Sequence, residues 1–542
     1  MNVPDLGFTP TIPVLIRRLA EQWGEREFLV TPDGRLTYAE AERTSRRVAK
    51  ELLARGYGKS SRIGFVFANT NDWVVMWLAV ARIGGVAMPF STTYRPAELR
   101  KALLIGDTHT LVIPTELFGH DLIDFMEDAI PALASADEPV LRLNGVPCLS
   151  RVLTTTPSGR AWAGMIDLQP CAGSDHDLIS DDYFSALEAQ VHPSDPMLVI
   201  FTSGTTAEPK GVVHSRGTYV RHAYNIADAN DIVGDQRVVG GAPFFWIGGV
   251  SHTLGPLMAR GNTLLCTPKF DAEGTIDLVE REGATVVSLF PYMAQRVFEQ
   301  ARRTGRDPSS IPLPPPSDVP ADRRTAPLGM TETCATYVAG GPRGHVIPEE
   351  YRGAQGFPVP MSEYRIADLV TGETLPEGVE GEICVRGYSL MLGMCKRERH
   401  EIFDDDGWYH TGDKGYLAGP YIFFTGRAKD LIKTAGANVA PREVEVVLDS
   451  HPDVLTSVVV GLDDPQRGEI VGAVVVPSAG ATIDPVALVT WANRELSSYK
   501  VPRRVVVVGE SDVPYLGTGK LDRRTLADRL RDGGVDVSPS QA

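Results

Sequence analysis

Short apolar runs alternate with longer amphipathic stretches along most of the chain. The runs at residues 63–67, 111–113 and 197–201 have the length and composition of buried strands. The stretches at 38–54 and 97–104 repeat their apolar residues at helical spacing. Strands that alternate with helices in this way predict an α/β fold.

Three segments depart from that alternation. Residues 73–90 are apolar, but Arg82 and the glycines at 84 and 85 interrupt them, so we expect a buried helix followed by a strand, not a membrane span. Residues 173–195 are acidic and polar, which indicates a surface connection. Residues 309–327 carry too many prolines for a helix or a central strand.

The pattern changes after residue 426. A charged helix around Glu443 and Glu445 precedes expected strands at 457–460, 472–476 and 504–508, which is an α+β pattern. A chain of 542 residues also exceeds the size at which one core keeps growing. We therefore expect a large N-terminal domain at residues 1–428 and a small C-terminal domain at residues 429–542.

Composition and charge narrow the class of protein. The net charge of −16 repels a phosphate backbone and argues against nucleic-acid binding, although it does not exclude a nucleotide. The six cysteines show no paired metal-ligand spacing, so we expect reduced thiols without a disulfide framework or a zinc site. No basic segment followed by an apolar run opens the chain, which predicts a cytoplasmic protein that does not bind membranes.

The strongest chemical signal is the segment MLVIFTSGTTAEPKGVVHS at residues 197–215, in which hydroxyls and glycines follow an apolar strand. Many donors and little bulk suit a polyphosphate. The segment is not a Walker loop, because Pro209 stands where the second glycine must be. A Ser/Thr-rich surface turn is the alternative, but the Pro-Lys-Gly at this spacing favours phosphate binding. The candidate phosphate-binding residues are Thr202, Ser203, Gly204, Thr205, Thr206 and Lys210.

Four further segments are weaker signals when taken singly. In GMTETC (329–334), Thr331 suits an α-phosphate and Glu332 suits Mg²⁺, while a helix cap is the alternative. In GWYHTGDKGYL (407–417), Asp413 could accept from two ribose hydroxyls. A fourth segment spans residues 426–445. The fifth, GTGKLDRR (517–524), carries Lys520, either a mobile catalytic cation or an ordinary solvated lysine.

Together, in this order and at these separations, the five segments resemble the core motifs of the adenylate-forming superfamily. That superfamily includes acyl-CoA synthetases, peptide-synthetase adenylation domains and beetle luciferases. Residues 82–96 and 381–393 agree with the resemblance, which covers nearly the whole chain and favours the AMP-forming acyl-CoA synthetase branch. It implies stacked αβ subdomains in the large N-terminal AMP-binding and acyl-binding domain, and a small mobile C-terminal domain.

The resemblance also implies a role for each matching residue. The segment from Thr202 to Lys210 would bind the triphosphate of ATP, Thr331 the α-phosphate, and Glu332 the Mg²⁺. Asp413 and Arg427 would bind the ribose, and Lys429 would be the hinge between the domains. Gly436 would line the tunnel for the pantetheine arm of coenzyme A, and Lys520 would catalyse adenylation. The acyl pocket would include Phe245, Trp246, Gly248 and Gly249. The aromatic residues in the last group could also be ordinary core.

The implied reaction forms the CoA thioester of a hydrophobic or bulky carboxylic acid through an acyl-AMP intermediate. Three departures from the family pattern all affect residues that would bind ATP. A Gly-Ala-Pro segment before the GMTE motif is missing, Leu328 replaces a common Tyr, and Ala207-Glu208 replaces a Gly in the phosphate segment. We therefore expect adenylation to be impaired or lost, with the acyl adenylate as the true substrate and a separate ligase as its source.

Three other readings stay open. The first is a conventional two-step synthetase that uses ATP, and the second is an adenylation enzyme that serves a carrier protein, although no fused carrier follows Lys520. The third is a non-catalytic adenylate-binding relative, against which Lys429, Gly436 and Lys520 argue. The identity of the acid and the oligomeric state, for which a homodimer is one option, are not determined by the sequence.

Overall fold

The computed structural model describes most of the chain, and the chain divides by its internal contacts into two units. The first unit comprises residues 1–363 and 385–409, and the second comprises residues 364–384 and 410–542. The residues that the structure describes are 3–169, 179–203, 209–289, 291–312, 320–342, 344–427, 432–434, 437–439, 441–465, 467–494, 496, 500–509, 512–514 and 521–537.

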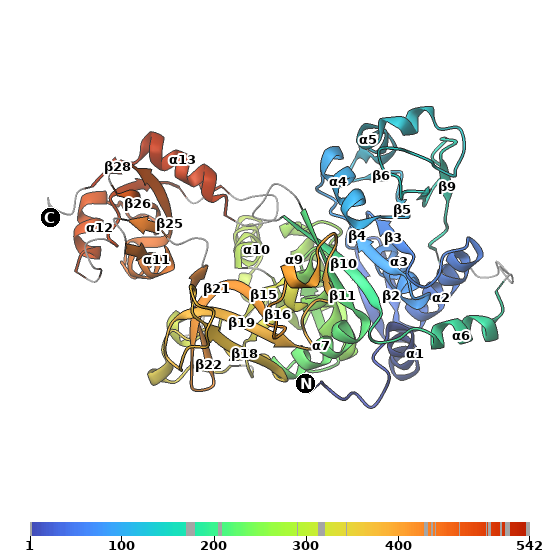
Figure 1. The fold of residues 1–542 in the computed structure, drawn as a ribbon, viewed down its shortest axis with the longest axis horizontal. Helices are drawn as coiled ribbons and strands as arrows, with labels where there is room; N and C mark the ends of the chain where they lie inside the picture. The colour runs from blue at the N-terminus through green and yellow to red at the C-terminus, as the bar shows by residue number, and fades with distance from the viewer. Residues whose placement is uncertain are drawn as a thin grey trace. The chain divides into compact units, whose positions relative to one another are not determined.

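Two large sheets form the centre of the first unit (Figure 1). In the five-stranded sheet the neighbours are parallel except for the last pair. Its order is β14 (Val286–Ser288), β12 (Arg237–Gly240), β13 (Thr263–Leu265), β1 (Glu27–Thr31) and β2 (Gly34–Thr37). The eight-stranded sheet runs in the order β20 (Gly393–Met394), β11 (Pro209–Ser215), β10 (Pro196–Ser203), β4 (Val86–Pro89), β3 (Arg62–Phe65), β5 (Thr110–Ile113), β8 (Arg151–Thr154) and β9 (Ala163–Met165).

Smaller elements and helices complete the first unit. Its other strands are β6 (Glu116–Leu117), β7 (His120–Asp121), β15 (Leu328–Met330), β16 (Ala335–Ala339) and β17 (Phe357–Pro358). Its helices are α1 (Ile12–Trp23), α2 (Tyr38–Ala54), α3 (Asn71–Arg82), α4 (Pro96–Gly106), α5 (Leu122–Ala129), α6 (Asp181–Ala189), α7 (Arg216–Ala229), α8 (Gly255–Ala259), α9 (Ala272–Glu282) and α10 (Pro291–Arg303). Short helical turns are η1 (Pro131–Ser135), η2 (Gly248–Leu254), η3 (Pro308–Ser310), η4 (Ala321–Arg323), η5 (Thr331–Thr333), η6 (Glu349–Tyr351) and η7 (Arg399–Glu401).

Two further sheets lie mainly in the second unit. The four-stranded sheet has the order β18 (Ser362–Ala367), β19 (Gly381–Gly387), β21 (Tyr409–Ala418) and β22 (Tyr421–Arg427). The other sheet has the order β24 (Ala437–Val439), β23 (Ile432–Thr434), β26 (Gly468–Pro477), β27 (Arg504–Val507) and β28 (Val535–Asp536), with β25 (Val454–Asp464) also paired to β26. Its helices are α11 (Pro441–Asp449), α12 (Pro485–Ala492) and α13 (Arg523–Gly533).

The α/β pattern predicted from the sequence is confirmed. The expected strands at 63–67, 111–113 and 197–201 correspond to β3, β5 and β10, and the expected helices correspond to α2 and α4. The apolar segment from 73 forms helix α3, which is buried from Trp73 to Arg82, followed by β4. None of the helices in the described ranges is long and apolar enough to cross a membrane. The predicted boundary at 428/429 lies outside the described residues and stays a prediction.

The acidic segment at 173–195 is not simply a surface connection, because it contains α6. Phe184 and Glu188 of this helix are buried. The carboxylate of Glu188 accepts hydrogen bonds from Arg82 Nε at 2.6 Å and from Arg17 Nη1 at 3.0 Å. Burying a charge is tolerable only with such partners, and those partners come from α1 and α3, far away in the sequence. Local polarity therefore could not predict the helix.

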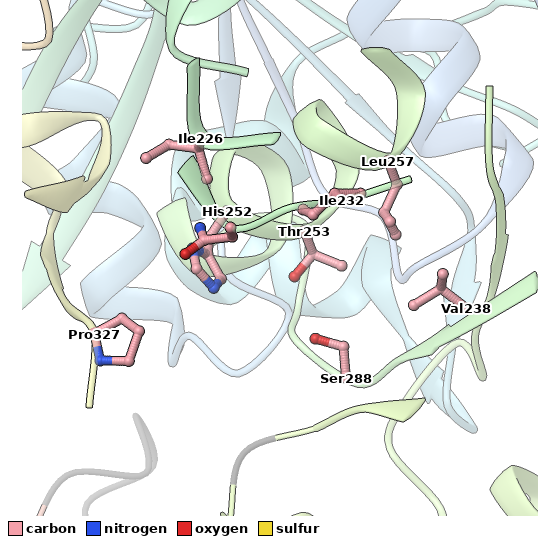
Figure 2. A pocket seen from close by; sticks show the side chains of 9 residues that line it. Ile226, Ile232, Val238, His252, Thr253, Leu257, Ser288 and Pro327 are labelled. Carbon is pink, nitrogen blue, oxygen red and sulfur yellow. The ribbon is translucent and has the colours of Figure 1, made fainter. Parts of the chain in front are cut away.

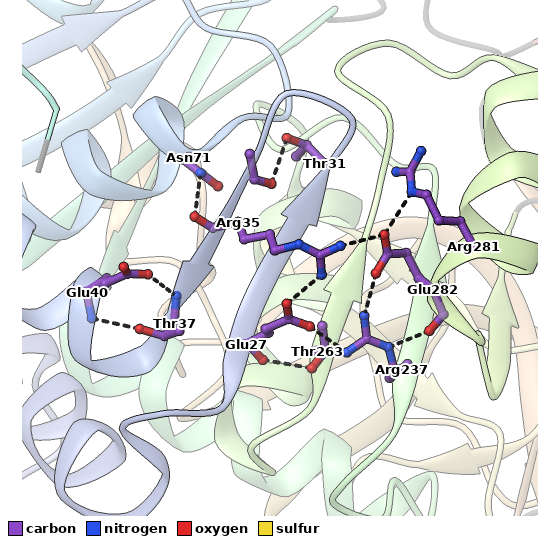
Figure 3. A network of polar contacts seen from close by, with 11 residues as sticks. Glu27, Thr31, Arg35, Thr37, Glu40, Asn71, Arg237, Thr263, Arg281 and Glu282 are labelled. Carbon is purple, nitrogen blue, oxygen red and sulfur yellow. Dashed lines mark hydrogen bonds and ion pairs between the residues drawn. The ribbon is translucent and has the colours of Figure 1, made fainter.

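Three arginines surround Glu282 at the end of α9 (Figure 3). The Glu282 carboxylate accepts from Arg35 at 2.8 Å and from Arg237 and Arg281 at 2.9 Å. Burial alone would raise the pKa of Glu282, but the hydrogen bonds from Arg281 and Arg35 outweigh it and hold the pKa below its usual range. The network therefore joins β2, β12 and α9 across the five-stranded sheet, since Arg35 lies on β2 and Arg237 on β12.

We predict that Glu282→Gln lowers the free energy of unfolding by about 1–3 kcal/mol, because three guanidinium groups lose their shared carboxylate and two of them are half exposed. Urea unfolding followed by circular dichroism measures this loss. Glu280→Gln is the matched control, since its carboxylate is 45% exposed and lies 3.8 Å from Arg306. It should change stability by less than about 0.5 kcal/mol. Equal losses of stability in the two variants would show that the Glu282 network does not have the stabilising role assigned to it.

Candidate active site

The Ser/Thr/Gly segment joins two antiparallel strands. β10 and β11 pair along their whole length, with Thr202 opposite Lys210 and Ser203 opposite Pro209. The two ends of the predicted phosphate segment are therefore neighbours across a hairpin. Gly204, Thr205 and Thr206 lie outside the described residues, so their predicted contacts stay predictions.

A second short turn is bonded to that hairpin. The turn is η5, which contains Thr331 and Glu332 and lies between β15 and β16. His214 on β11 donates from Nε2 to the carbonyl oxygen of Thr331 at 2.8 Å. The amide of Met391 donates to the carbonyl of Glu332 at 2.9 Å, and the amide of Leu392 donates to a β11 carbonyl at 2.8 Å. The hairpin, the turn and residues 391–395 therefore form one hydrogen-bonded assembly.

The backbone after η5 has an unusual conformation. Cys334 and Ala335 have positive φ angles of 58° and 98°, which non-glycine residues rarely adopt. Ser251 Oγ donates to the carbonyl of Cys334 at 2.6 Å and stabilises this conformation. Gly329 allows the close approach on the other side, because a Cβ there would lie 2.7 Å from the carbonyl oxygen of Ala335. Strain of this kind often occurs at functional sites.

Three histidines pack close to this turn. Burial lowers the pKa of His214 to about 4, although its hydrogen bond to Thr331 opposes the shift. Burial and the neighbouring His214 and His252 lower the pKa of His222 to about 3. Burial also lowers the pKa of His252, whose Nδ1 lies 2.8 Å from Thr336 Oγ1. All three rings are therefore neutral near pH 7, and none carries a charge to a phosphate.

Two charged side chains near the hairpin and the turn suit a metal-bound polyphosphate. Among the described residues, neither the Glu332 carboxylate nor the Lys210 ammonium makes an ion pair or a side-chain hydrogen bond. A half-buried carboxylate without a cation partner fits Mg²⁺, which prefers oxygen ligands. An ammonium without a carboxylate partner suits a phosphate oxygen.

The predicted ribose residues belong to the second unit. Asp413 is buried, and it lies directly opposite Arg427 in the pairing of β21 with β22. Its amide donates to Thr411 Oγ1 at 3.0 Å, and that hydroxyl donates to the carbonyl of Ile383 at 2.6 Å. The turn before Asp413 is thus held against β19 by side-chain hydrogen bonds.

A Glu-Cys-His group supports the same turn. The ligand atoms of Glu382, Cys384 and His410 lie within 4.8 Å of one another, which is close enough for a metal site. However, Glu382 Oε2 accepts from His410 Nδ1 at 2.7 Å, and Glu382 Oε1 accepts from the amide of Gly412 at 2.8 Å. Both carboxylate oxygens of Glu382 therefore already accept hydrogen bonds. Support of the turn explains why these three residues lie together, without a metal ion.

The predicted acyl segment ends in η2, a π-helical turn. Phe245 is buried and Trp246 is half buried, with their rings 5.7 Å apart at 79°. A Cβ at Gly249 would lie 2.0 Å from the carbonyl oxygen of Pro243. This close approach explains Gly249 without an acyl group, so the proposed role of Gly248 and Gly249 in giving space stays a prediction.

Other predicted site residues cannot be placed. Gly436, Lys429 and Lys520 lie outside the described residues, and only the backbone of Arg427 is described. In turn, sequence reasoning missed His214, Ser251 and His252. Nothing in the local pattern marks them, because their importance comes from contacts with residues 331–336, at least 80 positions away.

The two-unit α/β fold, with its hairpin fastened to the GMTE turn, defines an enzyme of the adenylate-forming class. A profile of the AMP-binding enzyme family matches residues 16–394, and a profile of the AMP-binding enzyme C-terminal domain matches residues 443–520. The chain belongs to the AMP-binding enzyme family, in its AMP-forming acyl-CoA ligase branch.

Individual relatives agree with this assignment. Indoleacetate–CoA ligase of Aromatoleum aromaticum is 30% identical over 517 residues, which is 92% of this chain and 94% of that protein. Feruloyl-CoA synthase of an Amycolatopsis species is 30% identical over 500 residues, which is 90% of this chain and 92% of that protein. The crystal structure of ATP-bound MatB from Rhodopseudomonas palustris superposes with a TM-score of 0.73 at 26% identity, covering 97% of this chain and 99% of that chain.

Because the buried histidines are neutral, we predict that the folded protein loses stability as the pH falls. The unfolded chain takes up a proton on His222 near pH 6.5, but the folded chain does so only near pH 3. This contribution to stability is complete above about pH 6.5 and is lost as the pH falls. It amounts to about 1.4 kcal/mol between about pH 7.5 and about pH 5.5. His222→Gln should reduce the acid-induced loss of stability by that amount in urea titrations at the two pH values.

The exposed His192 gives the control for that measurement. His192→Gln should leave the difference in stability between the two pH values unchanged. If His222→Gln shows the same acid loss as the wild type, the folded protein protonates this ring and the assignment is wrong.

Gly249 provides a test between a backbone role and an acyl-pocket role. We predict that Gly249→Ala costs about 3 kcal/mol or more, because the new methyl group overlaps the Pro243 carbonyl. Gly58→Ala is the control, since a Cβ there meets nothing within 4 Å, and stability should change by no more than about 1 kcal/mol. A Gly249→Ala protein of normal stability with an altered preference among acids would support the acyl-pocket role instead.

Proposed function

We propose that this ligase converts a hydrophobic or bulky carboxylic acid, with a ring as its main bulk, into a CoA thioester through an acyl adenylate. The observation that carries the proposal is the β10–β11 hairpin bonded through His214 to the Thr331–Glu332 turn, in a chain whose two domains match one family. The names of the two relatives, which specify indoleacetate and ferulate, support a ring acid.

In the first step the carboxylate oxygen attacks the α-phosphorus of ATP, a new P–O bond forms and pyrophosphate leaves. Two anions meet, so their charge must be neutralised. In this proposal the hairpin from Thr202 to Lys210 and the Thr331 hydroxyl hold the phosphates. Glu332 would hold Mg²⁺, which when bound supplies charge neutralisation on the phosphates. Lys520 would approach the α-phosphate.

In the second step the CoA thiol attacks the acyl carbonyl and releases its proton to solvent, a C–S bond forms, and AMP leaves with the electron pair of the C–O bond. Asp413 and Arg427 would hold the ribose throughout. Rotation of the C-terminal domain about Lys429 would remove Lys520 and bring Gly436 to the pantetheine arm. Exchange of these faces lets one site serve both steps.

We also propose that the ATP step is the slower one, with acyl-AMP as the better substrate. Leu328, at the start of β15, is half buried and aliphatic, so it offers adenine no aromatic face. By comparison with bases stacked in single-strand binders, the missing stack is worth about 1–3 kcal/mol, or about one to two powers of ten in affinity. A separate ligase would then supply the adenylate. The departures at Ala207 and Glu208 act in the same direction but lie outside the described residues.

A comparison of two routes tests the proposal. Thioester formation is followed by chromatography from indoleacetic or ferulic acid with ATP, Mg²⁺ and CoA, and separately from the synthetic acyl-AMP with CoA. We predict that the acyl-AMP route is at least about tenfold faster, and that Leu328→Tyr raises the ATP route about tenfold. The acyl-AMP route of the same variant should stay unchanged and is the internal control.

Other outcomes have definite meanings. Equal rates by the two routes would make the protein a conventional two-step ligase. Product only with a phosphopantetheinylated carrier protein in place of CoA would indicate a carrier-serving enzyme. No product by any route would contradict the proposed function as a whole.

A further inference from the structure

A cavity of about 210 Å³ lies within the first unit, beside η2. Figure 2 shows His252 and Thr253 of η2 next to this space, which Ser288 and Pro327 also border. Apolar side chains form much of the wall, among them Ile226 on α7 and Leu257 on α8. An apolar pocket with a few polar groups is the usual form of a small-molecule site.

His252, which lines this cavity, has one ring nitrogen without a partner among the described residues. The His252 side chain is exposed and lines the cavity. Its Nδ1 pairs with Thr336 Oγ1 at 2.8 Å, and among the described residues its Nε2 has no hydrogen-bond partner. The Thr336 hydroxyl either donates or accepts, so Nε2 presents a lone pair or an N–H as the ligand requires.

Two other polar groups share the cavity. Asn230 accepts the amide of Gly340 on its Oδ1 at 3.1 Å, while its Nδ2 has no partner within the described part of the chain. The Ser288 hydroxyl likewise makes no hydrogen bond with any described residue. The four polar residues at the cavity are Asn230, His252, Thr253 and Ser288, and Thr253 is already engaged with the carbonyl of Gly248 at 2.9 Å.

The size of the cavity limits its occupant. A cavity of about 150 Å³ lined by apolar side chains is known to hold benzene. The present volume of about 210 Å³ therefore suits one aromatic ring with a small substituent. A plain alkyl chain would displace water from the polar groups that it contacts and would offer them no hydrogen bond in return, which is costly.

From this arrangement we infer that His252 selects the substrate, and that the preferred acid carries a ring with a hydrogen-bonding substituent at its far end. The ring occupies the cavity, and its hydroxyl or N–H group bonds to His252 Nε2. This inference rests on the proposed function, because it names the acid that the ligase would activate. His252 is a specificity-determining residue and takes no part in the bond changes.

A matched set of acids tests the inference on the wild-type protein. The probes are cinnamic acids with hydrogen, methyl or hydroxyl at ring position 3 or 4, together with octanoic acid as the plain chain. The methyl and hydroxyl groups are nearly equal in size, so their ratio isolates the hydrogen bond. We expect kcat/KM for the better hydroxyl acid to exceed that of its methyl partner by about tenfold or more, mainly through KM.

Variants then assign the preference to His252. His252→Leu should remove the hydroxyl preference, so that kcat/KM falls more for the hydroxyl acid than for its methyl partner and the ratio approaches one. His252→Gln keeps a hydrogen-bonding group and should restore part of the preference, which a purely structural role would not do. Leu257→Met, on the apolar wall, is the matched control and should affect hydroxyl and methyl acids equally. Thr336→Val should weaken the preference, because the ring loses the partner that orients it.

The outcomes separate this inference from the proposed function. A thioester formed with equal efficiency from hydroxyl and methyl acids overturns the role of His252 but leaves the ligase intact. Faster use of octanoic acid than of every ring acid does the same. If His252→Leu does not fold, the wild-type ratios and His252→Gln still decide the question. Absence of thioester from every acid and from acyl-AMP contradicts the proposed function itself.

Discussion

The turn at residues 331–335 has to be held in a conformation that its own residues disfavour, and much of the candidate site depends on how this is done. Positive φ angles at Cys334 and Ala335 cost free energy that nearby contacts must offset. Hydrogen bonds reach this turn from β11, from η2 and from residues 391–395. The same contacts that stabilise the turn therefore bring the Thr331–Glu332 pair to the β10–β11 hairpin. Structure and site are built by one set of interactions.

The buried arginines of this chain have structural roles and are distinct from the accessible cations that could contact a substrate. Arg216 is fully buried and donates to the carbonyls of Ala81, Gly85 and Pro196, and burial lowers its pKa to about 10. Arg82 is likewise buried and bonds Glu188. These guanidinium groups hold elements together and are not accessible to a nucleotide. In a chain of net charge −16, the cations proposed for a triphosphate would have to be among the accessible side chains, of which Lys210 is one.

The outcome of sequence reasoning differs between elements for physical reasons. Helix α3 and strand β4 were predictable, because a continuous apolar run has to be buried whatever surrounds it. Helix α6 was not, because the partners of its buried Glu188 lie more than a hundred positions away. The glycines of η2 were predicted to leave space for a ligand. The structure gives Gly249 a different reason, the carbonyl of Pro243, which no local pattern reveals.

The sequence by itself determined the fold class and the family, because ordered motifs and the spacing of apolar residues are properties of the chain alone. It also identified Thr331, Glu332, Asp413 and Arg427 as candidates, and pairing in the sheet placed the last two opposite each other. Only the tertiary structure decided that His214, Ser251 and His252 gather around residues 331–336. A buried polar group is defined by the partner that satisfies it, and here each partner is brought near by folding and not by sequence.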